Sequence, residues 1–240
     1  IKEANSDFNV ILNKIRQPQR IIISWRPVAS VAASILLCVM LGLQVYNYKD
    51  NRRLNEFVNQ AATMTVESGE RTNITLPDGT RVALNAGTTI SYSVNYGLKN
   101  REVNLSGEAF FEVVKNPDKP FKLNTEYVGV EVLGTEFNVN AYADMDWVET
   151  TLINGSVKLT TKGATPQSII MSPKDKVVYS KAADKLSIVS GVSTRQEIDW
   201  MEGYLVFRSI AFGDVIKKLE KRYGVEIEIM NQDDNIGTFT

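Results

Sequence analysis

Carboxylates are the side chains of this 240-residue chain that could carry out catalysis. The chain has no histidine and one cysteine, Cys38, which excludes Ser-His-Asp catalysis, His-ligated metals and Cys-rich zinc or iron–sulfur sites. Glu108, Glu112 and Glu131 invite comparison with the paired carboxylates of a glycosidase. Nothing in the sequence brings them together, and solvated strand positions explain them better. We expect no catalytic residues, no cofactor and no metal site.

A second cluster of chemistry-bearing residues is basic. The segment FGDVIKKLEKRYG predicts an amphipathic helix, because its apolar residues recur every three to four positions. Its other face carries Lys217, Lys218, Lys221 and Arg222. The surrounding region is not basic enough for a nucleic-acid site, so none is expected. Two interpretations stay open, a solvated helix face and a docking surface for a protein partner.

Charge is distributed unevenly along the chain. Residues 1–53 contain eight basic and three acidic side chains, whereas the remainder contains nineteen basic and twenty-five acidic ones. The net charge of −1 therefore combines a basic segment with an acidic body. This asymmetry indicates that the two parts face different surroundings.

An uncharged run of 22 residues, 27–48, lies between Arg26 and Lys49. As a helix it would extend about 33 Å, enough to cross the hydrocarbon core of a bilayer. We expect a single transmembrane helix here. A signal peptide and a buried core helix are the alternatives, and both are disfavoured by the position of the run and its basic flanks. Flanking charge leans towards a cytoplasmic N-terminus.

Five regions follow from these patterns. Residues 1–26 are expected to be the end of a cytoplasmic region, 27–48 the transmembrane helix and 49–62 a helical stalk. Residues 63–190 show strand-like alternation with frequent turns, which predicts a jelly-roll-like β-sandwich. Residues 191–240 are expected to form a small α/β module, incomplete at the C-terminus. The fold class is therefore mainly β.

Two turn motifs stand out within the expected sandwich. Pro77-Asp78-Gly79 separates two alternating runs and predicts a hairpin, because proline fixes φ and glycine accepts a positive φ. Asn154-Gly155 is a strong short-range hairpin signal and predicts a second one. In the last region, GYLVFRSI and VEIEI are expected to be strands on either side of the basic helix, forming a β-α-β unit. The edges of those strands could pair with another protein.

Three motifs carry a resemblance to a known family: LPDGTRVALNAGTTI, VNLSGEAFFEVVKNPDKPFKL and VEVLGTEFNVNAY, in this order. The chain resembles the FecR family of anti-sigma regulators over about Val66 to Tyr179. Residues Trp200 to Gly203 and FGDVIKKLEKRYGVEIEI are similar to the module that follows in Bacteroidetes-type members. That module resembles the secretin and TonB N-terminal module.

The resemblance implies a signal relay built on protein–protein interaction. It places the chain in the inner membrane as a single-pass protein, with a cytoplasmic N-terminus and a periplasmic C-terminal part. The implied partners are an extracytoplasmic-function sigma factor, bound through a region preceding this sequence, and the signalling domain of a TonB-dependent outer-membrane receptor.

The resemblance also points to Gly134-Thr135, because some family members resemble proteins that cleave themselves at such a pair. The chemistry would be an N→O acyl shift, in which the Thr135 hydroxyl attacks the Gly134 carbonyl and water then opens the ester. It needs no histidine. Alternatively, Gly134 makes a bend between two strands and Thr135 pairs in the sheet.

A different class of function remains as an alternative. The chain could be a membrane-anchored envelope protein whose jelly roll binds carbohydrate, without any link to transcription. A helical domain upstream of Ile1 would favour the regulator, and a start codon immediately before Ile1 would favour the anchored binder.

Overall fold

The computed structural model describes Leu36 and residues 39–44, 61–207 and 210–229, within two compact units, Ile1–Asn55 and Glu56–Thr240. The expected cytoplasmic region 1–26, most of 27–48 and most of 49–62 lie outside the described residues. Leu36 and residues 39–44 are helical and exposed. Among the described residues, no helix has the length and apolar character needed to span a bilayer. The transmembrane helix stays a prediction.

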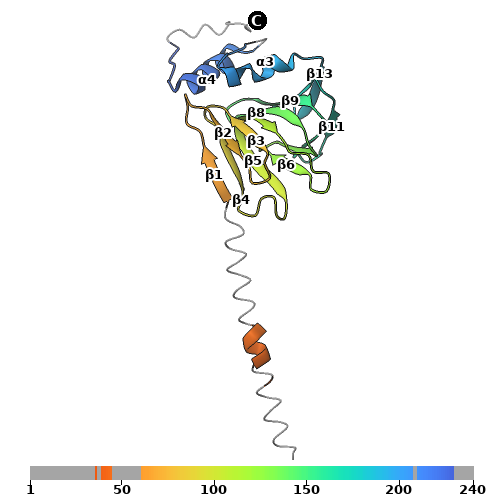
Figure 1. Ribbon diagram of the computed structural model, residues 1–240. Helices are drawn as coiled ribbons and strands as arrows, with labels where there is room; N and C mark the ends of the chain where they lie inside the picture. Colours follow the sequence, from red (N-terminus) through yellow and green to blue (C-terminus); the bar gives the residue numbers. More distant parts are fainter. Residues whose placement is uncertain (1–35, 37–38, 45–60, 208–209, 230–240) are drawn as a thin grey trace, which may run out of the picture. The chain divides into compact units, whose positions relative to one another are not determined.

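In the described part of the chain, thirteen strands form one sheet that curls into two facing layers (Figure 1). Layer A contains the first half of β5 (Arg101–Glu112) and six other strands: β1 (Ala61–Thr65), β4 (Thr89–Ser93), β6 (Phe121–Asn124), β7 (Val128–Val132), β10 (Val157–Thr161) and β11 (Ser168–Met171). Layer B contains the second half of β5 and six more: β2 (Thr72–Thr75), β3 (Arg81–Leu84), β8 (Glu136–Ala141), β9 (Trp147–Asn154), β12 (Asp175–Ser180) and β13 (Lys185–Ser190).

β5 belongs to both layers because it bends at Gly107. Residues up to Ser106 pair with β4, and residues from Gly107 onward pair with β8. Gly107 has φ +123°, and a Cβ there would lie 2.5 Å from the Thr88 hydroxyl oxygen. Only glycine combines this backbone conformation with such close packing. Gly107 is therefore the corner of the sandwich.

The core fills the space between the two layers. Phe111 and Phe137 of layer B stack with ring centroids 5.2 Å apart, and Phe111 meets Phe121 of layer A at 5.8 Å. All three side chains are fully buried. The alternating residues that the sequence places on one face of each strand are the ones that build this core. The mainly β architecture is confirmed.

One of the two expected hairpins is correct and the other is wrong. β2 and β3 pair across Pro77-Asp78-Gly79, where Gly79 has φ +87°. Asn154-Gly155 connects β9 to β10, but β9 pairs with β8 and β12 in layer B, whereas β10 pairs with β7 and β11 in layer A. The turn carries the chain from one layer to the other. An Asn-Gly pair reverses the chain locally, but it does not decide which strand becomes the neighbour.

After the sandwich, the chain forms α3 (Thr194–Ile198), the 3₁₀ helix η1 (Asp199–Glu202) and α4 (Phe212–Tyr223). We call the described residues of 194–229 the C-terminal segment. The expected helix is present, but residues 204–207 and 225–229 are not strands. The prediction of a strand on each side of α4 is therefore wrong for these residues, because alternation alone supplies no neighbouring ladder for their backbone groups. Figure 1 shows α3 and α4 on the same side of the sandwich.

Candidate functional site

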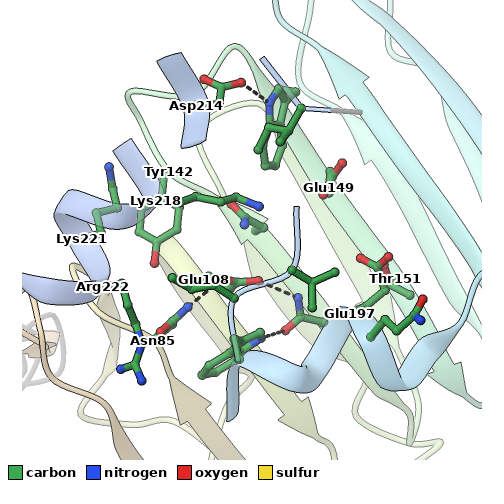
Figure 2. A pocket seen from close by; sticks show the side chains of 18 of the residues that line it. Asn85, Glu108, Tyr142, Glu149, Thr151, Glu197, Asp214, Lys218, Lys221 and Arg222 are labelled. Carbon is green, nitrogen blue, oxygen red and sulfur yellow. Dashed lines mark hydrogen bonds between the residues drawn. The ribbon is translucent and has the colours of Figure 1, made fainter. Parts of the chain in front are cut away.

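The outer face of layer B is polar where the C-terminal segment covers it. In β5, β8 and β9, alternate residues point either to the core or away from it. The outward set on these strands includes two carboxylates, two amides and a hydroxyl: Glu108, Glu149, Asn138, Asn140 and Thr151. Together with the C-terminal segment they enclose a cavity of about 490 Å³ (Figure 2).

Glu108 is held at the floor of this cavity by amides. Asn85 Nδ2 donates to one carboxylate oxygen at 2.8 Å and Asn138 Nδ2 donates to the other at 3.1 Å. The indole N–H of Trp200, in η1, donates to Asn138 Oδ1 at 3.2 Å, which ties the C-terminal segment to this network. Burial raises the pKa of Glu108, although the positive charge of Lys218 acts in the opposite direction.

Glu149 occupies a second charged position in the same cavity. Lys176 Nζ lies 3.6 Å from Glu149 and 2.7 Å from Glu197 of α3. Burial raises the pKa of Glu149, while the charges of Lys176 and Lys218 oppose the rise. Figure 2 shows Lys218 reaching from α4 into the cavity. One lysine of the C-terminal segment thus acts electrostatically on both carboxylates of the sandwich.

The basic face of α4 points towards the sandwich. Lys217 Nζ donates to the backbone carbonyl of Asp144 at 2.7 Å, and Lys221 forms an ion pair with the Asp144 carboxylate. Lys218 lies over the Trp147 ring at 5.6 Å, and the Trp147 indole donates to Asp214 at 3.2 Å. The surface that this face contacts lies within the same chain, so the solvated interpretation is wrong for these lysines and docking of a separate partner on them stays a prediction.

Gly134 and Thr135 form a closely packed corner between β7 and β8. A Cβ on Gly134 would lie 2.6 Å from the Lys115 Cα, and one on Gly155 would lie 2.9 Å from the Thr135 hydroxyl oxygen. The buried Thr135 hydroxyl donates to the Ser156 carbonyl at 3.0 Å. Both glycines are therefore required by packing, and the Asn154-Gly155 turn is the element that covers the candidate cleavage pair.

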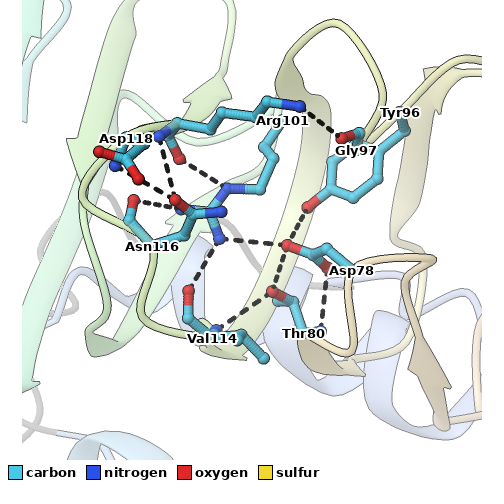
Figure 3. A network of polar contacts seen from close by, with 9 residues as sticks. Asp78, Thr80, Tyr96, Gly97, Arg101, Val114, Asn116 and Asp118 are labelled. Atoms are coloured by element: carbon cyan, nitrogen blue, oxygen red, sulfur yellow. Dashed lines mark hydrogen bonds and ion pairs between the residues drawn. The ribbon is translucent and has the colours of Figure 1, made fainter.

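A buried ion pair between Arg101 and Asp78 connects several loops (Figure 3). Arg101, 2% exposed, lies 3.2 Å from the Asp78 carboxylate. Its guanidinium also donates to the backbone carbonyls of Val114, Asn116 and Lys119, at 2.8, 3.2 and 2.7 Å.

Asp78 is equally well satisfied. It accepts hydrogen bonds from the backbone N–H and the hydroxyl of Thr80, both at 2.9 Å, and from the Tyr96 hydroxyl at 3.1 Å. Burial, followed by the charge of Asp78, raises the pKa of Tyr96. Asp78, which the sequence predicts only as part of a turn, therefore connects its own turn to the Tyr96 loop and, through Arg101, to the loop of residues 114–119.

The three carboxylates considered for glycosidase chemistry do not converge. Glu108 lines the cavity under the C-terminal segment, Glu112 pairs with Arg81, and Glu131 of layer A lies 4.0 Å from Lys122. Among the described residues, no group of three or more Asp, Glu or Cys side chains is placed to hold a metal.

Comparison with known proteins decides the family. The model of the FecR protein family matches residues 62–158, and that of the FecR C-terminal region matches residues 204–240. Two crystal structures of a candidate anti-sigma factor from Parabacteroides distasonis are each 30% identical to this chain, with a TM-score of 0.65. They cover 70% and 69% of this chain, and 76% of that chain in both cases. The chain belongs to the FecR family. No curated protein matches it significantly.

The cavity lies where the two FecR family regions meet. Glu108, Asn138 and Glu149 fall within the residues matched by the first model, whereas Asp214 and Lys218 fall within those matched by the second. In this FecR protein, the candidate site is therefore a junction between modules rather than a pocket within one of them.

Sequence reasoning missed several residues of the buried ion-pair network and of this junction. Arg101 shares strand parity with the buried Val103 and Leu105, so an arginine on an inward face was a signal that could have been used. Asp144 and Trp147, which receive α4, carry no comparable signal, because only the folded chain brings residues 70 positions apart into contact.

Proposed function

We propose that this FecR protein is an anti-sigma regulator that relays a signal across the inner membrane by protein–protein interaction. The observation that carries the proposal is the structural match, over 70% of the chain, to a candidate anti-sigma factor. A mainly β body in which Glu108, Glu112 and Glu131 lie apart fits recognition better than glycoside hydrolysis.

The membrane part of the proposal rests on residues 27–48. Five apolar side chains of the described helical residues are at least half exposed: Leu36, Val39, Met40, Leu41 and Leu43. Apolar side chains on an uncovered helix favour a lipid surrounding. The basic N-terminal segment would lie in the cytoplasm and the acidic body in the periplasm.

Two partners belong to the proposal. An extracytoplasmic-function sigma factor would bind through the region preceding the membrane helix. The periplasmic signalling domain of a TonB-dependent receptor would bind the region after Gly191. In support, the described residues of this region expose large side chains, namely Tyr204, Tyr223, Val225 and Ile229.

The receptor interaction can be tested by pull-down. The detergent-solubilised full chain would be compared with a variant lacking residues 192–240, using the purified periplasmic signalling domain of a TonB-dependent receptor from the same organism as bait. We expect the full chain to be retained and the shortened variant to be lost. Equal retention of both would contradict the assignment of the receptor site to the C-terminal region.

Self-cleavage at Gly134-Thr135 is a separate part of the proposal. The Thr135 hydroxyl is oriented by the Ser156 carbonyl, and a cavity of about 380 Å³ borders the pair. Freshly expressed wild type and Thr135→Ala would be compared on denaturing gels. Two fragments from wild type and one band from the variant are expected if the acyl shift occurs. A single uncleaved band for both would remove this part of the proposal.

A further inference from the structure

A second cavity, of about 360 Å³, lies beside η1 and is bordered by two arginines. Arg71 comes from the segment before β2, and Arg222 comes from the last turn of α4. Arg71 Nη1 donates to the Trp200 carbonyl, and Arg222 Nη2 donates to the Gly203 carbonyl at 3.3 Å. Both guanidinium groups therefore gather at the C-terminal end of the same short helix.

Gly203 keeps the space between the two arginines open. It has φ +99°, and a Cβ there would lie 3.3 Å from Arg222 Nη2 and 3.5 Å from Arg71 Nη2. The two guanidinium groups approach one point from different elements, the sandwich and the C-terminal segment. A side chain at Gly203 would enter that point.

These two arginines differ from the others in the described part of the chain. Arg81, Arg101 and Arg195 each lie within 4.0 Å of a carboxylate. Within the same described residues, neither Arg71 nor Arg222 has such a carboxylate. Burial lowers the pKa of Arg71, and the neighbouring charge of Arg222 lowers it further. Two like charges held together retain unused donors that an anion would satisfy.

The surroundings indicate what kind of anion fits. Met201 lines the cavity at 38% exposure, and Tyr223, 63% exposed, lies with its ring 6.0 Å from the Arg222 guanidinium carbon. Two guanidinium forks beside exposed apolar side chains match a carboxylate flanked by apolar residues, as on a protein surface. A second copy of this chain is a poor candidate, because its body beyond residue 53 has six more acidic than basic residues and would repel itself.

We propose that Arg71 and Arg222 form a clamp for an acidic side chain of the protein partner, with Met201 and Tyr223 as its apolar flank. This inference rests on the proposed function, in which the partner is the signalling domain of the receptor. The clamp joins a residue of the sandwich to a residue of α4, so the partner reads the docked arrangement of the two.

Binding of the full chain to that signalling domain, measured by calorimetry at 50 and 300 mM NaCl, tests the clamp. Arg71→Gln and Arg222→Gln should each weaken binding by about tenfold at low salt and reduce its salt dependence. Arg195→Gln is the matched control, because Arg195 is an exposed arginine of the same segment that is already paired. Gly203→Ala tests whether binding needs the open space between the two arginines, because it fills that space while both charges are retained. Circular dichroism would verify that each variant is folded.

The outcomes distinguish failure of the clamp from failure of the receptor assignment. Wild-type binding that both glutamine variants retain would overturn the clamp and leave the receptor assignment intact. No binding by the wild type would overturn both. A partner Asp→Arg or Glu→Arg variant that abolishes binding to the wild type, and restores it with Arg222→Glu, would identify the residue that the clamp holds.

Discussion

Two interfaces of this protein have different chemistry. The interface between layers A and B is apolar, with Phe111, Phe121 and Phe137 fully buried and in ring contact. The interface between layer B and the C-terminal segment is lined by charged and amide groups around a cavity. The first is made by the hydrophobic effect, which salt hardly weakens. The second includes a small apolar cluster, Trp200 against Ala83 and Phe110, and beside it ion pairs and hydrogen bonds that salt and pH can change.

This difference implies different mobility. A fully buried core resists opening until the whole sandwich unfolds, whereas partly exposed ion pairs contribute at most about 1 kcal/mol each. The C-terminal segment is therefore expected to leave layer B without unfolding the sandwich. Such an arrangement suits a regulator in which partner binding alters the docking of one module on another.

The largest expected effect comes from the apolar interface. Phe111→Ala should lower the free energy of unfolding by about 3–5 kcal/mol, because it leaves a cavity between two other phenylalanines. Urea denaturation followed by circular dichroism measures this loss. A loss below about 1 kcal/mol would mean that the layers are not held by this cluster.

The buried ion pair should come next. Arg101→Met leaves Asp78 buried without its charged partner, and we expect a loss of about 3 kcal/mol in unfolding free energy. Arg81→Met is the matched control: it breaks the more exposed pair with Glu112, and it should cost less than about 1 kcal/mol. Equal losses would show that the Arg101 network contributes no more than a surface pair.

The docking contacts should have smaller, local effects. In a double-mutant cycle of Asp144→Ala and Lys221→Ala, the coupling energy should be about 0.5–1 kcal/mol. The cycle would use hydrogen exchange of α4 as its measure of opening. The unfolding midpoint of the sandwich should not change. A shift of that midpoint comparable with that of Phe111→Ala would contradict the distinction between the two interfaces.

The smallest expected effect is on pH dependence. The folded-state pKa of Glu108 is raised above its ordinary value of 4.5, so the folded state binds the proton more tightly than the unfolded state does. This group therefore destabilises the fold progressively as pH rises from about 4.5 through the raised pKa. Glu108→Gln should flatten that part of the stability–pH curve. An unchanged curve would show that Glu108 does not carry the effect.

Much of the sandwich could be predicted because local alternation determines which side of a strand is buried. Val82, Val103 and Phe137 lie in the core as their spacing indicates. Strand neighbours could not be predicted in the same way, as the turn at Gly155 shows, because pairing depends on contacts far along the chain. The prediction of two strands beside α4 was wrong for the same reason.

The candidate site could be predicted from the sequence only in part. The basic face of α4 was identified from residue spacing, but its contact with Asp144 and Trp147 requires the folded chain. Glu108 was singled out for a chemistry that its neighbours do not support, and its amide partners Asn85 and Asn138 carry no signal of their own. Sequence reasoning finds unusual residues more readily than it finds the residues that they meet.

The difference between the two interfaces can be tested most directly by hydrogen–deuterium exchange of the full chain at 50 and 500 mM NaCl. We expect backbone amides of α4 to exchange several-fold faster at the higher salt, because the lysine contacts to the sandwich are screened. Amides of β5 and β8 should keep their protection. Unchanged protection of α4, or simultaneous loss in α4 and β5, would contradict the account of a salt-sensitive, separable docking interface on an apolar sandwich.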